Sequence, residues 1–91
     1  MTDAIGQINF NAPAELRKWP SLNGRRNDNA AFPGTYLVVE GTLDECIGQF
    51  ISKPVSQRHL YEIQTVPQGD LVTGVMTAEQ IAHLAQFREF L

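Results

Sequence analysis

The fold is decided by one stretch of the sequence, Thr35-Tyr36-Leu37-Val38-Val39-Glu40-Gly41-Thr42-Leu43-Asp44-Glu45-Cys46-Ile47. Residues 36–39 are apolar in consecutive positions and rich in β-branched and aromatic types, which is typical of a central strand that is buried on both faces. Thr42 then supplies a helix N-cap, and Glu45 completes a capping box three residues later. The stretch therefore predicts a strand that runs directly into a helix.

The predicted helix has one apolar stripe and a clear end. The stripe consists of Leu43, Cys46, Ile47, Phe50 and Ile51, at positions i, i+3, i+4, i+7 and i+8. This spacing places all five side chains on one face, which is expected to pack on a sheet. Pro54 stops the helix.

A second pair of elements follows toward the C-terminus. Residues 58–66 alternate as a strand does, residues 67–70 have turn chemistry, and residues 71–76 are predicted to return as an antiparallel strand. Thr77 and Gln80 then form the capping box of a last helix.

The N-terminal third has weaker signals. Residues 5–10 alternate enough for a short edge strand, residues 11–18 have room for one helical turn, and residues 16–33 are rich in Asn, Arg, Gly and Pro and predict a long loop. We therefore expect one domain, with residues 1–34 as an arm or loop on an α+β core of residues 35–91.

The order of elements predicts a β-α-β-β-α two-layer sandwich with an extra N-terminal strand. A right-handed crossover through the first helix makes the first two strands parallel and leaves room for one strand between them. This pattern resembles most of a ferredoxin-like sandwich, βαββαβ, without its last strand. The strand predicted at residues 5–10 would replace that last strand. A resemblance of fold pattern implies no function.

Composition narrows the classes of function. The chain has 91 residues, 43% hydrophobic and 19% charged, with a net charge of −3, an ordinary soluble composition for one small domain. Residues 1–34 hold four of the seven Lys and Arg residues but only three of the ten Asp and Glu residues. A mildly basic arm on an acidic body argues against a broad phosphate-binding surface, so nucleic acid is not the expected partner.

The single cysteine and the lack of a long apolar run are used to predict the cellular compartment. Cys46 has no second cysteine to pair with, so neither an intrachain disulfide nor a multi-cysteine metal site is expected, which fits the cytoplasm. No run approaches the roughly 20 apolar residues of a membrane helix.

We predict no catalytic residue, metal site or cofactor. His59 and His83 have neither a nucleophile nor a carboxylate at a spacing that enforces convergence, and Cys46 lies on the apolar helix stripe as a small buried hydrophobe. The glycines form no phosphate-binding loop before a helix.

The leading hypothesis is a protein-interaction module without catalytic activity. By strand alternation, Tyr36 and Val38 face opposite to Leu37 and Val39, so the sheet would carry apolar groups on both faces. Since both helices cover one face, the arm, a second copy of the chain or a ligand must cover the other. We expect the arm and a homodimer partner to cover it together. The interface candidates are Tyr36, Val38, Trp19 and Phe90.

Two alternatives remain. A regulatory module that binds a small metabolite would use Arg25, Arg26, Arg58, His59 and Tyr61. A weak RNA binder would stack bases on the open sheet face, but there Tyr36 has no second aromatic partner in residues 71–75, and basic residues do not alternate with aromatic ones.

Overall fold

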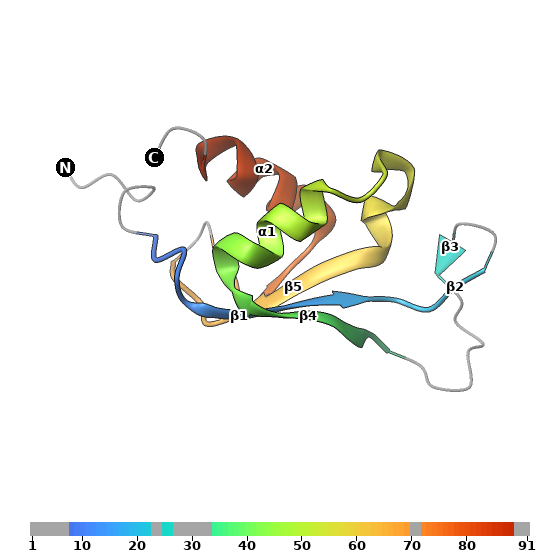
Figure 1. Cartoon of the computed structure of the whole chain (residues 1–91), viewed down its shortest axis with the longest axis horizontal. Helices are drawn as coiled ribbons and strands as arrows, with labels where there is room; N and C mark the ends of the chain where they lie inside the picture. Colours follow the sequence, from blue (N-terminus) through green and yellow to red (C-terminus); the bar gives the residue numbers. More distant parts are fainter. Residues whose placement is uncertain (1–7, 23–24, 27–33, 70–71, 89–91) are drawn as a thin grey trace.

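The computed structural model describes residues 8–22, 25–26, 34–69 and 72–88, and in it two α-helices cover one face of a four-stranded antiparallel sheet (Figure 1). The predicted two-layer α+β sandwich is confirmed. The strands are β1 (Pro13–Lys18), β2 (Ser21–Leu22), β3 (Arg25–Arg26), β4 (Tyr36–Thr42), β5 (Tyr61–Thr65) and β6 (Val75–Met76). The helices are α1 (Leu43–Ile51), the 3₁₀ helix η1 (Val55–Leu60) and α2 (Ala78–Arg88).

The N-terminal segment supplies a central strand. The sheet order is β4-β1-β5-β6, and β1 pairs antiparallel with β4 on one side and with β5 on the other. The prediction of a helical turn over residues 11–18 is therefore wrong. A single turn gains little hydrogen bonding, whereas β1 has a ladder on both sides.

Residues 13–18 consequently belong to the core and not to an arm. Ala14 and Leu16 are buried beneath the helices, while Glu15 and Arg17 alternate with them on the opposite face. The extra N-terminal strand exists, but at Pro13–Lys18. In the strand predicted over residues 5–10, residues 8–10 are not extended and residues 5–7 lie outside the described residues.

The strands before and after α1 have the relative direction that was predicted. Because β1 is antiparallel to both neighbours, β4 and β5 run parallel with one strand between them, and α1 lies in the connection. The strand of the C-terminal hairpin, β6, pairs with the other side of β5. In a ferredoxin-like sheet the hairpin strand fills this gap, whereas here β1 fills it and β6 lies at the other edge. The N-terminal strand therefore does not replace the missing last strand of that pattern.

β4 lies at the edge of the sheet, so the prediction of a central strand there is wrong. The central positions belong to β1 and β5. One apolar residue from each of the four strands forms a row across the sheet beneath the helices: Val39, Leu16, Ile63 and Met76. Leu16, Ile63 and Met76 are fully buried in this row, and Val39 packs against it. An apolar run alone does not distinguish an edge strand from a central one.

Both helix starts form as predicted. The backbone N–H of Glu45 donates to Thr42 Oγ1 over 3.1 Å, and the N–H of Thr42 donates to Glu45 Oε1 over 3.2 Å. Thr77 and Gln80 make the same reciprocal pair at the start of α2, with distances of 2.9 and 3.4 Å. Each cap satisfies backbone donors that a helix start leaves unpaired.

The strand predicted over residues 58–66 is shorter than expected. Residues 55–60 form η1, in which the Arg58 guanidinium donates to the backbone oxygens of Ile51, over 2.7 Å, and Lys53, over 3.1 Å. The Ile51 oxygen lies in the last turn of α1, where carbonyl groups lack intrahelical partners, and Lys53 lies just beyond the helix. The Arg58 side chain thus closes α1, and β5 begins only at Tyr61.

A turn after β5 and a small ladder before β4 complete the description of the fold. Gly69 has φ +85°, the left-handed conformation predicted for the turn after β5, and β6 occupies only the last two residues of the strand predicted over 71–76. Within the predicted long loop, β2 and β3 pair as a small antiparallel ladder, which lies beyond the helices at one end of the molecule (Figure 1).

Candidate functional site

The exposed edge of the sheet is the first candidate site. Among the described strands, β4 has a neighbour on one side only. Tyr36, Leu37 and Val38 follow one another along it with 48%, 46% and 36% of their surface exposed. Such a strand presents unpaired N–H and C=O groups together with apolar side chains.

A β-bulge explains why three consecutive residues are exposed. Leu16 pairs with Val39 and Arg17 with Leu37, so Val38 is an extra residue in β4. Val39 then packs against the core, while Leu37 shares the open face with Arg17. The expectation that Leu37 and Val39 face the same way is therefore wrong.

The face of the sheet opposite the helices is largely polar. On it, Arg17 donates to Glu15 Oε1 over 2.9 Å, to Thr35 Oγ1 over 2.8 Å and to the Thr35 backbone oxygen over 3.0 Å. The Gln64 amide donates to Glu62 over 3.2 Å. This face is therefore not the apolar second face that was predicted, although Glu62 on it is buried, with 8% of its surface exposed.

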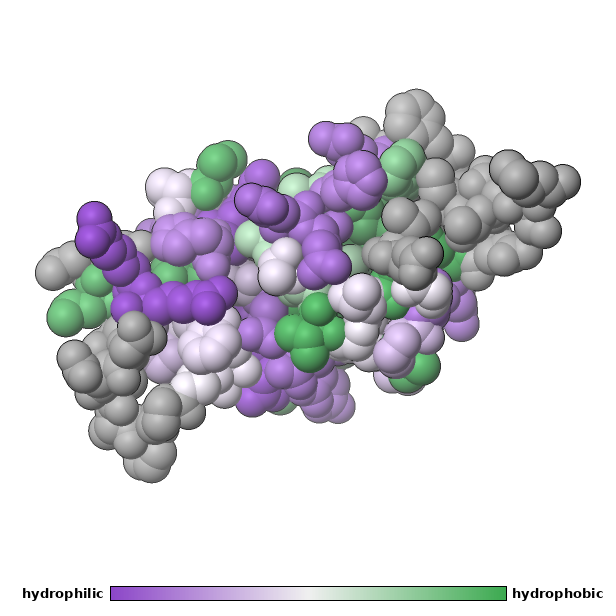
Figure 2. All heavy atoms as spheres, turned by 180° about the vertical axis from the view of Figure 1, so that it is seen from behind, coloured by the Kyte–Doolittle hydropathy of each residue, from purple (hydrophilic) through white to green (hydrophobic). Residues whose placement is uncertain are grey.

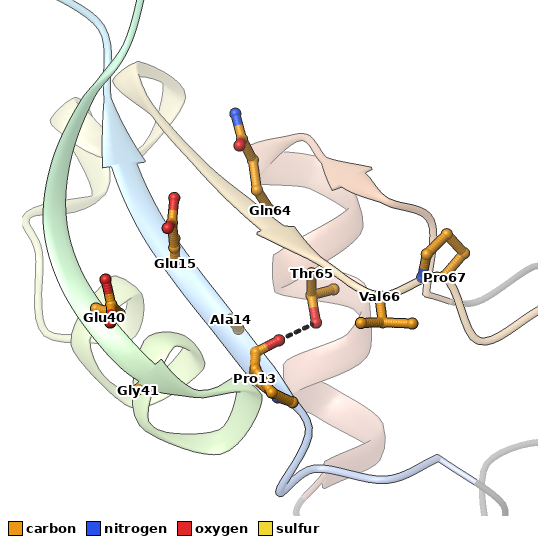
Figure 3. A pocket seen from close by; sticks show the side chains of 9 residues that line it. All are labelled: Pro13, Ala14, Glu15, Glu40, Gly41, Gln64, Thr65, Val66 and Pro67. Carbon is orange, nitrogen blue, oxygen red and sulfur yellow. Dashed lines mark hydrogen bonds between the residues drawn. The ribbon is translucent and has the colours of Figure 1, made fainter.

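A shallow hollow of about 730 Å³ lies on this open face, with the helices behind the sheet (Figure 3). Its wall consists of Pro13, Ala14, Glu15, Glu40, Gly41, Gln64, Thr65, Val66 and Pro67. The two carboxylates and the amide suit the charged group of a cationic ligand. The prolines and the valine suit an apolar chain attached to that group. At the floor, the Thr65 hydroxyl donates to the Pro13 backbone oxygen over 2.8 Å.

The sequence contains a signal for this hollow that the sequence-based predictions did not use. Ala14 and Leu16 alternate with Glu15 and Arg17, which is the period of a strand with one polar face. Recognising β1 would have placed Glu15 on the open face. Its pairing with Glu40 and Gln64 depends on strand order.

The five metabolite-binding candidates do not converge on the hollow. Arg25 and Arg26 are exposed on β3, and Arg58 is engaged at the end of α1. His59 is exposed on η1, and Tyr61 is buried in the core.

Three of the four interface candidates lie among the described residues. Tyr36 and Val38 are exposed on β4, whereas Trp19 is half-buried just beyond β1. The Arg26 guanidinium lies 4.5 Å from the centre of the Trp19 ring, and the buried indole Nε1 has no hydrogen-bond partner among the described residues. Phe90 lies outside the described residues.

The remaining reactive groups have structural surroundings. The pKa of the Cys46 thiol is raised to about 11, mainly by burial and also by the nearby Glu45 and Glu15 charges, while a backbone hydrogen bond at Leu16 lowers it. This holds the thiol protonated at neutral pH, in its unreactive form. His83 makes an edge-to-face contact with Phe87, with 4.8 Å between the ring centres.

The described residues contain neither a membrane-spanning helix nor a metal-binding cluster. No helix there is long and apolar enough to cross a bilayer. Nor do three or more His, Cys, Asp or Glu side chains come together there in a way that could hold a metal ion.

Comparisons with protein-family models, curated proteins and solved structures find no match to this chain. The function proposed below is therefore based on the geometry of the chain's own residues.

Proposed function

We propose that this protein is a cytosolic, non-catalytic interaction module that self-associates through the outer edge of β4. The observation that supports it is the run of exposed apolar residues, Tyr36 to Val38, on a strand that has a partner on one side only among the described strands. Pairing along this edge satisfies backbone groups and buries apolar surface in one step.

A second copy of the chain is the partner that fits this edge. Edge strands of monomers are usually protected by charges, prolines or bulges. Residues 36–39 contain no charge and no proline, so the bulge at Val38 is their one such feature. A two-fold axis through two antiparallel copies of β4 buries the same apolar residues of both chains at once. The bulge at Val38 also twists the edge, which limits pairing to a strand of matching shape.

The test is the solution mass, measured by light scattering during gel filtration over a wide concentration range. We expect wild type to reach twice the 10.1 kDa chain mass and Val38→Asp to remain a monomer, because a buried unpaired carboxylate is unfavourable at such an edge. Val55→Asp is the matched control, since Val55 is 75% exposed on η1 and away from β4. It should leave the dimer intact.

A second edge variant guards against misfolding of the first. Leu37→Lys adds a charge to the edge at an exposed position, and circular dichroism checks that both variants keep their fold. A wild-type monomer at every concentration, or edge and control variants of equal mass, would contradict the proposal.

The metabolite-binding alternative is supported by the hollow on the open face and not by the arginine candidates. Glu15 and Glu40 favour a cationic ligand there. A thermal-shift screen with small amines tests it, because a ligand at 100 times its dissociation constant adds about 2.7 kcal/mol to stability. A stabilising amine whose effect disappears in Glu40→Gln would support this function.

A further inference from the structure

Three cations lie on aromatic rings at the end of the molecule that carries β2 and β3. Lys18 Nζ and Lys53 Nζ lie 5.7 and 5.8 Å from the centre of the same Tyr61 ring, and Arg26 lies over Trp19. These side chains come from β1, β3, β5 and the segments after β1 and α1. The fold thus creates the mixture of basic and aromatic groups that the linear sequence lacks.

The charges of this cluster are not neutralised by the described part of the protein. No described carboxylate lies within ion-pair distance of Lys18, Lys53 or Arg26, and the described ion pair joins Arg17 to Glu15. Both ammonium groups lie near the same Tyr61 ring, so a bound anion would be attracted to both. Figure 2 shows strongly hydrophilic side chains gathered at this end.

Four of the described acidic side chains lie away from the cluster, whereas Glu62 follows Tyr61 in β5 and is buried. Glu15 and Glu40 face the hollow on the open sheet face, and Asp44 and Glu45 lie at the start of α1, at the opposite end of β4 from Tyr36. A polyanion would therefore be repelled from the sheet face and attracted to the cluster.

We propose that Lys18, Lys53 and Arg26 bind the phosphate backbone of a single-stranded nucleic acid. Single-strand sites combine cations that follow the backbone with flat surfaces on which bases stack. The guanidinium over the Trp19 indole offers such a surface, because a base can stack on either plane. The cluster is away from the open face that an RNA-binding sheet would use, and it does not depend on pairing at β4.

The experiment is a fluorescence-anisotropy titration of a labelled oligouridylate with the full chain at several KCl concentrations. Each phosphate contact to a single strand contributes about −0.7 to the slope of log K against log salt, so three cations predict a slope of about −2. The double variant Lys18→Gln/Lys53→Gln should lower the magnitude of that slope to about 0.7 and weaken binding at low salt by about tenfold or more.

The control variant changes the net charge equally in another place. Val66→Glu/Val75→Glu also lowers it by two, at exposed positions beside the hollow and on β6, and should leave the slope near −2. Lys18→Arg/Lys53→Arg keeps the charges and should keep binding, which separates loss of charge from loss of fold.

Competitors identify the ligand chemistry. Inorganic phosphate at the same charge concentration should displace the oligonucleotide poorly, because it offers one anion and no base. Polyglutamate should also compete poorly, whereas equal competition would indicate an acidic protein partner and overturn the proposal. Absence of salt-dependent binding, or the same slope in the glutamine variant and wild type, would overturn it as well.

Discussion

Replacing Leu16 by Ala tests the placement of the N-terminal segment. Leu16 is fully buried in β1, between Val39 of β4 and Ile63 of β5 and beneath the helices. Removing a buried leucine side chain typically costs about 2–5 kcal/mol, with the higher values where the cavity cannot collapse. A central strand with neighbours on both sides has little freedom to collapse.

The expected loss is large compared with the stability of a small domain, which is roughly 5–15 kcal/mol. Each kcal/mol lowers the melting temperature by about 4–8 °C in a chain of this size. We would measure urea unfolding at one fixed protein concentration, since self-association couples stability to concentration. Far-UV circular dichroism and the fluorescence of Trp19, the one tryptophan, serve as probes.

Leu22→Ala is the matched control. Leu22 is the same residue type within the same predicted arm, but it is 62% exposed on β2, so its loss should change stability by less than about 0.5 kcal/mol. If Leu16→Ala does not fold, Leu16→Val gives a milder measurement, with a cost of roughly 1 kcal/mol. Equal effects of Leu16→Ala and Leu22→Ala would refute the central position of β1.

Three further predictions follow from local contacts. Thr42→Ala should cost about 1 kcal/mol in urea unfolding through loss of the α1 cap, and a Thr42→Ser variant that is no more stable than Thr42→Ala would contradict that role. Arg58→Met keeps the side-chain length but leaves the backbone oxygens of Ile51 and Lys53 unpaired, so hydrogen exchange should quicken in the last turn of α1 and not in its first turn. Because the pKa of Cys46 rises from 9.0 to about 11 on folding, the unfolded chain loses the thiol proton first, and stability should fall between these pH values; Cys46→Ala should fall less over the same range.

The sequence-based predictions succeeded where neighbouring residues determine the structure. Thr42 with Glu45, and Thr77 with Gln80, identified both helix starts, since each cap requires only residues three positions apart. Gly69 identified the turn for the same reason. By contrast, Arg58 was assigned to a strand because its bonds to the end of α1 depend on how the chain turns back after Pro54.

The candidate sites could be predicted from the sequence less well than the fold. Tyr36 and Val38 were predicted as exposed apolar positions and are exposed, but on an edge strand and not on an open apolar face. Glu15 and Glu40 become neighbours only through strand pairing. No sequence signal could have joined Lys18 and Lys53 around Tyr61, because they are far apart in the chain.

The sequence by itself determined the two capped helices, the strand before the first of them, the turn at Gly69 and the α+β class. These features depend on side chains that bond to the backbone within a few residues, or on apolar periodicity within one element. Only the tertiary structure decided that β1 is central, that β4 is an edge and that three cations gather at one end. Strand order depends on which segments bury the most apolar surface together, while the backbone hydrogen bonds that join strands are available to nearly every residue type.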